Sequence, residues 1–240
     1  MLVEVCANSL ESAKNAEIAG ADRIELCVEL GVGGITPSYG LLKSIKEQIH
    51  IPVHVLIRPR SGDFTYSNEE FNCMLDDIAL CVKMGFNGIV SGVLHKNFTL
   101  DIERTKKLIK ATKDLKFTFH RAFDWIKNPF EAQVELENLK VAYILTSGQQ
   151  KSAVMGLSLL EELKTKSLKT TILPASGITP DNCKLFKEKN FDVIHLSGTS
   201  MLKTLDKTPV ISMNAPAFLK DDELAISNSA IIAEVLKAVK

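Results

Sequence analysis

The chain has 240 residues, 45% of them hydrophobic, which is enough to bury a substantial core as one large domain. Its 29 basic and 29 acidic side chains balance without a long run of either sign, which argues against a nucleic-acid or anionic-membrane surface. The N-terminus lacks a basic segment followed by an apolar one, and no apolar stretch approaches the ~20 residues that span a bilayer, so we expect a cytoplasmic protein.

Short runs rich in β-branched and aromatic residues recur along the chain, with helical segments between them. In chain order, the runs that predict strands are residues 3–7, 23–27, 53–59, 88–94, 116–123, 142–148, 170–177 and 193–199. Strands that alternate with helices pair in parallel through right-handed crossovers, and eight such units in ~250 residues are typical of an α/β protein with a (β/α)8 TIM-barrel fold. We therefore predict a single barrel domain over residues 1–240.

A doubly wound open sheet is the alternative fold. The segment GVGGIT at residues 31–36 argues against it, because Thr36 stands where the dinucleotide-binding pattern has its third glycine.

Several residues predict where the helices begin and end. Helix N-caps followed by proline are expected at Thr36-Pro37, Asn128-Pro129 and Thr179-Pro180, a capping box at Ser67 and Glu70, and a helix C-terminus at Gly20. After the eighth strand the pattern loosens, and residues 202–226 predict an irregular loop over one barrel end before a last helix at about 228–239. Loops of that length are often functional.

The five cysteines are odd in number and free of CxxC spacing, so we expect reduced thiols rather than a disulfide framework or a zinc site. Cys6 and Cys27 occupy matching positions at the ends of the first two strands. Neighbouring strands lie ~4.8 Å apart, so the two sulfurs can approach a common point. Paired thiolates suit a soft ion, above all Cu(I). Simple packing of two buried cysteines is the alternative interpretation.

The predicted strands alternate aliphatic residues with polar or ionisable ones. If the aliphatic faces meet the helices, the opposite faces point into the barrel. The side chains expected there are Glu4, Cys6, Glu25, Cys27, His54, Arg58, His120 and His195. Burying ionised groups costs several kcal/mol each unless they are paired, so this concentration favours a functional site. The alternative is a self-neutralising cluster in which Arg23 and Arg58 offset Glu4 and Glu25 and the histidines are neutral.

An enzyme would use this interior at the C-terminal rim of the barrel, where (β/α)8 enzymes build their sites. The catalytic candidates are then Glu4, Glu25 and His120, and the ligand-binding candidates are Arg58, Arg60, Asp63, His54, His195 and Ser197. Pairing of Arg60 with Asp63 to hold their own loop is the alternative. Arg121 has outward parity and is expected to brace a neighbouring loop through Asp124.

Two loops of small residues add a weaker signal for an anion. ASGIT at residues 175–179 and LSGTS at residues 196–200 follow the seventh and eighth strands, where many barrels bind phosphate. Tight turns also need glycine, so the loops alone do not decide between these interpretations.

Several segments in this order and spacing resemble the CutC family, known as copper homeostasis proteins. They include EVCANSLESAKNAEIAGADRIELC, GGITPSYG, IPVHVLIRPRSGDFTYS, FHRAFD and ILTSG, and the resemblance runs from residue 2 to about residue 200. It implies a cytoplasmic (β/α)8 barrel that forms a homo-oligomer, a dimer or tetramer, and handles copper, with Cys6 and Cys27 as the candidate ligands.

Two functional hypotheses follow. The first is a copper homeostasis protein that binds Cu(I) through Cys6 and Cys27. The alternative is an enzyme acting on a small polar or anionic metabolite, including a phosphorylated one, by general acid/base chemistry at the barrel rim. The enzyme accounts better for the surplus of carboxylates, histidines and arginine, since a soft copper ion needs none of them.

Overall fold

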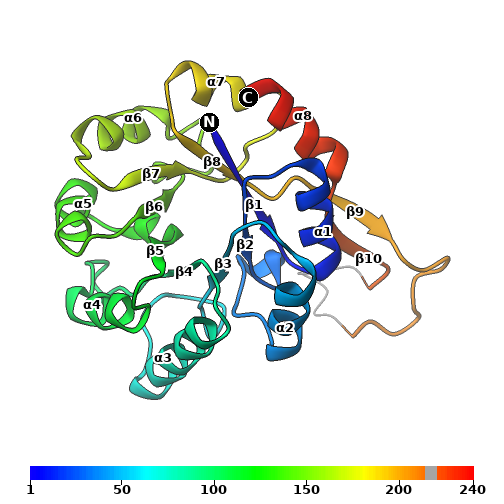
Figure 1. The fold of residues 1–240 in the computed structure, drawn as a ribbon, viewed down its shortest axis with the longest axis horizontal. Coiled ribbons are helices and arrows are strands. Elements are labelled where there is room, and N and C mark those ends of the chain that lie inside the picture. Colours follow the sequence, from blue (N-terminus) through cyan, green and yellow to red (C-terminus); the bar gives the residue numbers. More distant parts are fainter. Residues whose placement is uncertain (214–220) are drawn as a thin grey trace.

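The computed structural model describes residues 1–213 and 221–240 and arranges eight parallel strands in a ring. The strands are β1 (Leu2–Ala7), β2 (Arg23–Leu26), β3 (Val53–Leu56), β4 (Gly88–Ser91), β5 (Lys116–Phe119), β6 (Tyr143–Thr146), β7 (Thr171–Pro174) and β8 (Val193–Leu196). Strand pairing runs from β7 back to β1 and from β1 to β8, and β7 and β8 flank the place where the ring nearly closes (Figure 1). The predicted (β/α)8 TIM-barrel fold is therefore confirmed.

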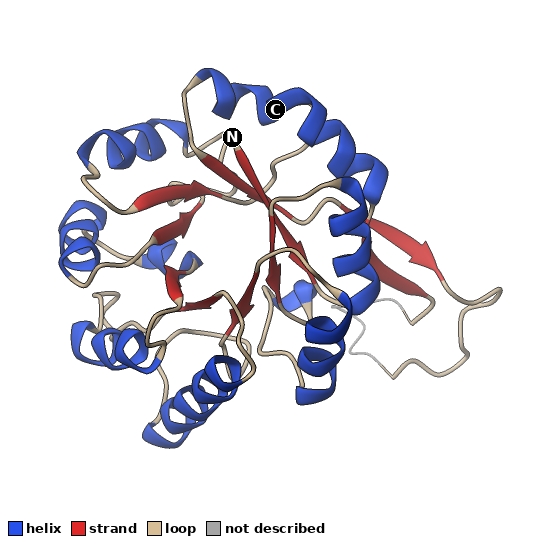
Figure 2. Cartoon of the chain, in the orientation of Figure 1, coloured by secondary structure: helices blue, strands red, loops and turns tan. Residues whose placement is uncertain are grey.

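Helices form the outer layer around this ring (Figure 2). They are α1 (Leu10–Ala19), α2 (Tyr39–Gln48), α3 (Asn68–Lys83), α4 (Ile102–Ala111), α5 (Pro129–Asn138), α6 (Leu157–Lys166), α7 (Cys183–Glu188) and α8 (Ser229–Val239), with short 3-10 helices η1 (Leu30–Val32) and η2 (Arg121–Trp125). Across residues 1–213 and 221–240, none of the helices is both long enough and apolar enough to cross a bilayer.

Local signals set the ends of several helices as predicted. Before α3, the Ser67 hydroxyl accepts from the Glu70 N–H and the Glu70 carboxylate accepts from the Ser67 N–H, which makes a complete capping box. α5 begins at Pro129, directly after Asn128. Gly20 ends α1 at φ 92°, a left-handed conformation that glycine adopts without strain.

Two predicted helix starts are wrong. α2 begins two residues later than expected, after its cap Ser38, because the Thr36 hydroxyl instead accepts a 2.9 Å hydrogen bond from the Arg58 N–H. α7 begins at Cys183 and not directly after Thr179, since three residues of turn separate them. In both cases the predicted cap lies in the loop that leads into the helix.

The alternation of residues along the strands sorts their side chains into two layers. Aliphatic residues such as Val5, Ile24 and Ile194 are fully buried in the main core, which includes residues of the surrounding helices. Two smaller apolar clusters are formed by residues of the opposite strand faces: Cys6, Cys27, Leu56 and Val90 in one, and Leu145, Leu173, Ala175 and Val193 in the other. The predicted division between a helix-facing and an interior face is confirmed.

The irregular loop expected over residues 202–226 is wrong in part. β9 (Thr199–Lys203) and β10 (Glu223–Ser227) pair as an antiparallel ribbon, which leaves the side of the barrel and does not cover its end (Figure 1). The Ser227 N–H donates a 3.1 Å hydrogen bond to Ser12 Oγ, which ties β10 to α1. The two strands are joined by about twenty residues, so no short turn in the sequence signals their pairing.

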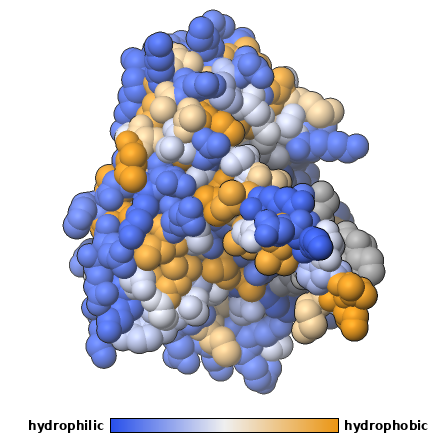
Figure 3. Space-filling model, turned by 90° about the vertical axis from the view of Figure 1, so that its right-hand side faces the viewer, coloured by the Kyte–Doolittle hydropathy of each residue, from blue (hydrophilic) through white to orange (hydrophobic). Residues whose placement is uncertain are grey.

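Figure 3 shows the side of the molecule that carries this ribbon, with hydrophobic residues mixed among hydrophilic ones. The exposed apolar side chains of the ribbon include Met201, Leu202 and Leu224. Residues 214–220, which belong to the expected loop, lie outside the described residues.

Candidate functional site

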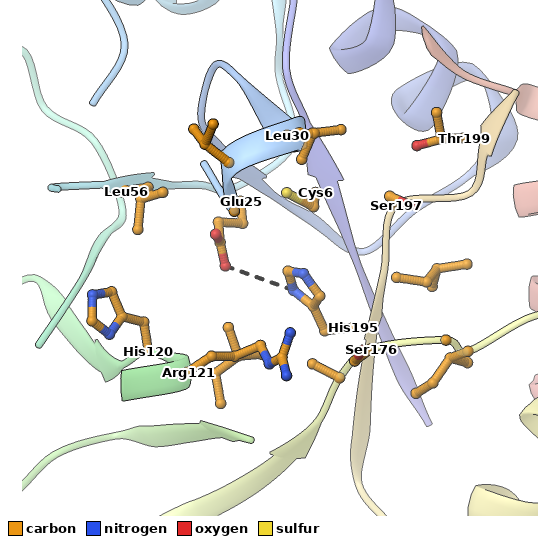
Figure 4. Close-up of a pocket in the computed structure, with 18 of the residues that line it drawn as sticks. Cys6, Glu25, Leu30, Leu56, His120, Arg121, Ser176, His195, Ser197 and Thr199 are labelled. Atoms are coloured by element: carbon orange, nitrogen blue, oxygen red, sulfur yellow. Dashed lines mark ion pairs between the residues drawn. The ribbon is translucent and has the colours of Figure 1, made fainter. Parts of the chain in front are cut away.

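A cavity of about 870 Å³ opens where the C-terminal ends of the strands meet. Strand ends and the loops after them form its walls, with contributions from Cys6, Glu25, Leu56, Arg58, His120, Leu145, His195 and Ser197. Figure 4 shows the side chains around this space, with Glu25 facing His195 and Cys6 close to both. Because (β/α)8 enzymes place their chemistry at this end of the barrel, the cavity is the candidate functional site.

Glu4 is the centre of a buried charge cluster where β1 meets β2 and β8. The strand register places it opposite Arg23 and His195. Arg23 Nε donates to one Glu4 oxygen, and His195 Nδ1 lies 2.7 Å from the other. Burial alone raises the pKa of Glu4, but the His195 hydrogen bond and the Arg23 charge outweigh it and lower the pKa to about 2. Glu4 is thus an enclosed, ionised pairing partner that does not line the cavity.

His195 is held as a cation between two carboxyl groups. Its Nδ1 lies 2.7 Å from Glu4 Oε1 and 3.7 Å from Glu25 Oε2. Burial lowers the pKa of His195, but the Glu25 and Glu4 carboxylates, together with Cys6, raise it well above its usual value. The Glu4–Arg23 pair therefore matches the self-neutralising cluster that the sequence left as an alternative. That alternative had neutral histidines, and the cationic His195 differs from it.

Glu25 differs from Glu4 because its Oε2 makes an ion pair with His195 Nδ1 at 3.7 Å but no hydrogen bond to it. Glu25 Oε2 is buried and has no hydrogen-bond partner among the described residues. Burial raises the pKa of Glu25 to about 7, and the Glu4 charge adds to this although the His195 cation opposes it. A carboxyl group that titrates near neutral pH on the wall of a cavity can both accept and donate a proton.

The two cysteines approach each other as predicted. Cys6 Sγ and Cys27 Sγ lie 3.5 Å apart in a buried sulfur hydrogen bond, and Cys6 also lines the cavity. Gly34 leaves them space, because a Cβ there would lie 3.4 Å from Cys27 Sγ and 2.7 Å from Leu56. The hydrogen bond with Cys27 and burial raise the pKa of Cys6 well above its usual value. Cys6 is therefore a thiol at neutral pH, and a bound metal ion must displace its proton.

His120 is a neutral imidazole in one tautomer. Its Nδ1 accepts a 3.2 Å hydrogen bond from the Ala122 N–H, which places the ring proton on Nε2. Nε2 has no partner among the described residues, and burial together with the Arg58 charge lowers the His120 pKa to about 3. The ring packs against Phe64, with 4.8 Å between the two ring centroids. His120 thus offers the cavity wall an unpaired N–H donor.

Arg58 is expected to bind an anion, but the two terminal nitrogens of its guanidinium donate hydrogen bonds to backbone carbonyls. Nη1 donates to Val32 O at 2.8 Å and to Gly34 O at 2.9 Å, and Nη2 donates to Gly62 O at 2.8 Å. These carbonyls belong to the loops after β2 and β3. Arg58 therefore fastens the two loops together while it contributes to the cavity wall.

Arg60 and Asp63 are not among the residues that line the cavity. Arg60 Nε lies 2.6 Å from Glu70 Oε1, and its Nη2 lies 3.3 Å from Asp63 Oδ1. Asp63 also accepts a 2.8 Å hydrogen bond from the Thr65 N–H. The structure therefore matches the alternative in which these residues hold their own loop.

His54 is a buried interior residue that also lies outside the cavity lining. Its ring centroid lies 6.1 Å from that of Tyr143, and burial lowers the His54 pKa to about 4, which makes it neutral at physiological pH. Gly88 on the next strand provides the space for the ring, because a Cβ there would lie 2.5 to 2.7 Å from three of its atoms. Of the other predicted ligand-binding residues, His195 and Ser197 do line the cavity.

Arg121 is a cavity residue that the sequence analysis missed. Strand alternation predicted an outward direction, but β5 ends at Phe119 and the chain then turns into η2. Arg121 Nε donates to Asp124 Oδ2 at 2.8 Å, as predicted, and Nη2 donates to Ser147 Oγ at 3.1 Å. Figure 4 shows the guanidinium reaching across the space toward Ser176. Residues alternate between the two faces only within a strand, so the end of β5 at Phe119 is the signal that Arg121 need not point outward.

Among the described residues, two groups of side chains offer ligands for a metal ion. One is the sulfur pair, and the other is Glu4, Glu25 and His195, whose ligand atoms lie within 4.8 Å of one another. Both Glu4 oxygens are already engaged by Arg23 and His195, and these cations repel a further positive charge. The cysteine pair is therefore the better candidate for a metal site, and its sulfurs suit a soft ion.

The ring of parallel strands, its outer layer of helices and the rim cavity define the chain as a (β/α)8 barrel with a ligand-sized site. The chain belongs to the CutC family, whose family model matches residues 1–200. This confirms the family that the sequence resembles.

Curated relatives carry the same family name. A CutC family protein of Enterobacter sp. (strain 638) is 45% identical over 197 residues, which cover 82% of this chain and 80% of the relative. One of Klebsiella pneumoniae subsp. pneumoniae is 41% identical over 240 residues, which cover 99% of this chain and 97% of the relative.

Solved structures agree on the fold. The crystal structure of a CutC protein from Streptococcus agalactiae, provisionally described as a copper homeostasis protein, aligns with a TM-score of 0.78 at 30% identity, over 82% of this chain and 98% of that one. Thiamine phosphate pyrophosphorylase from Pyrococcus furiosus aligns with a TM-score of 0.59 at 15% identity, over 99% of this chain and 95% of that one. The second likeness reflects the fold alone.

Proposed function

We propose that this protein binds Cu(I) through Cys6 and Cys27 and acts in copper homeostasis. The observation that carries the proposal is the 3.5 Å separation of the two Sγ atoms. Paired thiolates are ligands of the kind that Cu(I) prefers, whereas structural zinc sites take four protein ligands. The description of the Streptococcus agalactiae relative as a copper homeostasis protein supports the same choice.

The surroundings of Cys6 and Cys27 suit reversible binding of a Cu(I) ion. Cys6 lines the open cavity while Cys27 is fully buried, so an ion can enter from the cavity and be held by a sulfur behind its wall. Cys6 lies on β1 and Cys27 directly follows the last residue of the neighbouring strand β2, so the barrel sets their spacing. We place this activity in the cytoplasm, where thiols stay reduced, and expect a dimer or tetramer.

Titration of Cu(I) against a competing Cu(I) chelator, under anaerobic and reducing conditions, tests the proposal. We expect one ion per chain in the wild type and its loss in Cys6→Ser, in Cys27→Ser and in the double variant. Cys73→Ser is the matched control, because it removes an exposed thiol on α3 and should leave binding unchanged. Wild-type affinity in the double variant would exclude these cysteines as the ligands.

A second candidate function is an enzyme that uses general acid/base chemistry on a small metabolite. Glu25 and His120 favour it, since each lines the cavity and each has a buried polar atom without a hydrogen-bond partner among the described residues. Leaving such atoms unpaired costs about 1–3 kcal/mol each. A soft copper ion needs neither group, so their retention favours a ligand with hydrogen-bonding atoms.

A thermal-shift screen against a broad set of small polar and anionic metabolites tests this second function. We expect one chemical class to stabilise the protein, and Glu25→Gln to abolish turnover of that class while it still binds. Absence of any stabilising compound would count against the enzyme without affecting the copper proposal.

A further inference from the structure

The wall of the cavity carries more positive than negative charge. Arg58 and Arg121 contribute guanidinium cations, whereas Glu25 is the one acidic residue that lines the cavity among the described residues. A ligand that fills this space is therefore expected to be an anion.

Arg121 is held in position to meet that anion. Its partner Asp124 accepts hydrogen bonds from Thr146 Oγ1 at 2.5 Å, from the Ser147 N–H at 2.9 Å and from the Gln149 N–H at 3.2 Å. The Asp124 carboxylate is thus fixed to the loop after β6, and it fixes the guanidinium in turn. Arg121 Nη1 has no partner among the described residues, so it is available to a ligand.

Two loops supply further donors on the side to which Arg121 points. In the part of the chain that the structure describes, the backbone N–H groups of Ser176, Gly177, Ile178 and Gly198 donate to no protein acceptor, and all four residues line the cavity. Ser176 has φ 81°, a left-handed conformation that is strained for a residue with a side chain. Thr199 Oγ1 is a buried cavity-wall atom that also lacks a hydrogen-bond partner within residues 1–213 and 221–240.

We infer that this cavity binds a small metabolite through a terminal phosphate group, held between the Arg121 guanidinium and the free N–H groups of residues 176–178 and Gly198. The inference rests on the second candidate function and names its substrate class. A carboxylate has about four acceptor sites on its two oxygens, fewer than these five donors, whereas a phosphate presents three strong acceptor oxygens. The Arg121 guanidinium, whose Nη1 has no partner among the described residues, is also suited to phosphate recognition.

The rest of the metabolite must reach the reactive side chains. A cavity of about 870 Å³ is far larger than a phosphate ion, so the ester extends toward Glu25 and His120. Among the described residues, His120 Nε2–H has no hydrogen-bond partner and suits a carbonyl or hydroxyl oxygen of the ligand. Glu25 Oε2, which makes an ion pair with His195 but no hydrogen bond there, suits a proton beside that oxygen. The substrate class is therefore a small phosphate ester that carries a carbonyl or hydroxyl group.

Calorimetric titration with inorganic phosphate at constant ionic strength tests the site directly. We expect saturable binding at one site per chain, weakened about tenfold or more in Arg121→Gln because a charge-assisted contact is lost. Lys127→Gln is the matched control, since it removes an exposed positive charge six residues further along the chain that does not line the cavity. Its affinity should equal that of the wild type.

Further arms separate the possible outcomes. Arg121→Lys keeps the positive charge but loses the forked pair of N–H donors, so it should bind phosphate with intermediate affinity. It takes the place of Arg121→Gln if that variant unfolds at a much lower temperature than the wild type. Acetate binding more tightly than phosphate, an unaltered affinity in Arg121→Gln, or no saturable phosphate binding would each overturn the inference.

The copper and enzyme proposals have separate readouts. The Cys6→Ser, Cys27→Ser double variant should lose Cu(I) and still bind phosphate. Glu25-dependent turnover of an uncharged compound, without phosphate binding, would overturn the phosphate site and leave the enzyme standing.

Discussion

Glu4 Oε1 and His195 Nδ1 lie 2.7 Å apart and join the first and last strands of the barrel through a buried contact. Arg23 on the other neighbouring strand completes the cluster by donating to the second Glu4 oxygen. Apolar residues of similar size are often at least as stabilising as buried ion pairs. What this arrangement achieves in addition is a cationic His195 at the cavity wall, facing Glu25 at 3.7 Å.

Removing the Glu4 charge should destabilise the fold. Glu4→Gln leaves the buried Arg23 without its counter-charge and His195 with Glu25 alone at 3.7 Å, and we expect the free energy of unfolding to fall by about 3 kcal/mol. Urea denaturation at pH 7 measures it. Glu11→Gln, at an exposed position in the first turn of α1, is the control and should stay within about 0.5 kcal/mol of the wild type. A loss below about 1 kcal/mol in Glu4→Gln would contradict the paired cluster.

Glu25 should make the protein less stable as pH rises from about 4.5 to 7. Its pKa is raised from 4.5 to about 7 in the folded protein, so over this range the folded state keeps a proton that the unfolded chain has released. Below pH 4.5 the contribution of Glu25 to the free energy of unfolding is fully present. It falls by up to about 3 kcal/mol as the pH rises to 7. Denaturation at a series of pH values should show a flatter profile for Glu25→Gln than for the wild type. Parallel profiles would show that Glu25 ionises normally.

Space for the His54 ring depends on a missing side chain. Gly88→Ala would place a Cβ 2.5 to 2.7 Å from three ring atoms of His54, so we expect a loss of about 1–3 kcal/mol from overpacking. Gly40→Ala is the control, because the nearest atom to its new Cβ lies 4.0 Å away on Ser38 and alanine favours the helix. Thermal unfolding of both variants decides the point. Equal melting temperatures for the two variants would mean that the residues around His54 rearrange to accept the extra Cβ at little cost.

The interior of the barrel was predictable because strand alternation is a local property. Glu25 and His195 lie on the interior faces of β2 and β8, and both reach the cavity as their parity predicts. The sequence also placed Cys6 and Cys27 near each other, and the sulfurs do meet. The expected matching positions are wrong, because the strand register pairs Cys6 with Glu25 and Cys27 lies two residues further along. Which polar atoms remain unpaired was not predictable, because it depends on contacts between residues far apart in the chain.

The roles of residues beyond the strand ends could not be predicted from the sequence, for physical reasons. Arg121 follows the last residue of β5, where alternation stops and a 3-10 helix redirects the side chain into the cavity. Thr36 has the chemistry of a helix cap, but its hydroxyl is used by the Arg58 N–H from another loop. The guanidinium of Arg58 is likewise committed to carbonyls that only the folded loops bring to it.

Copper binding at Cys6 should release protons. The Cys6 pKa is raised well above its usual value, so the thiol is protonated at neutral pH and Cu(I) must displace that proton to bind the thiolate. Apparent Cu(I) affinity should therefore rise at least about tenfold per pH unit between pH 6 and 8, because at least one proton leaves for each ion bound. A weakly buffered titration with a pH indicator counts the protons directly. Cys73→Ser should release the same number as the wild type, and the Cys6→Ser, Cys27→Ser double variant should release none. Copper binding that is independent of pH over this range would mean that the ion is bound elsewhere in the protein.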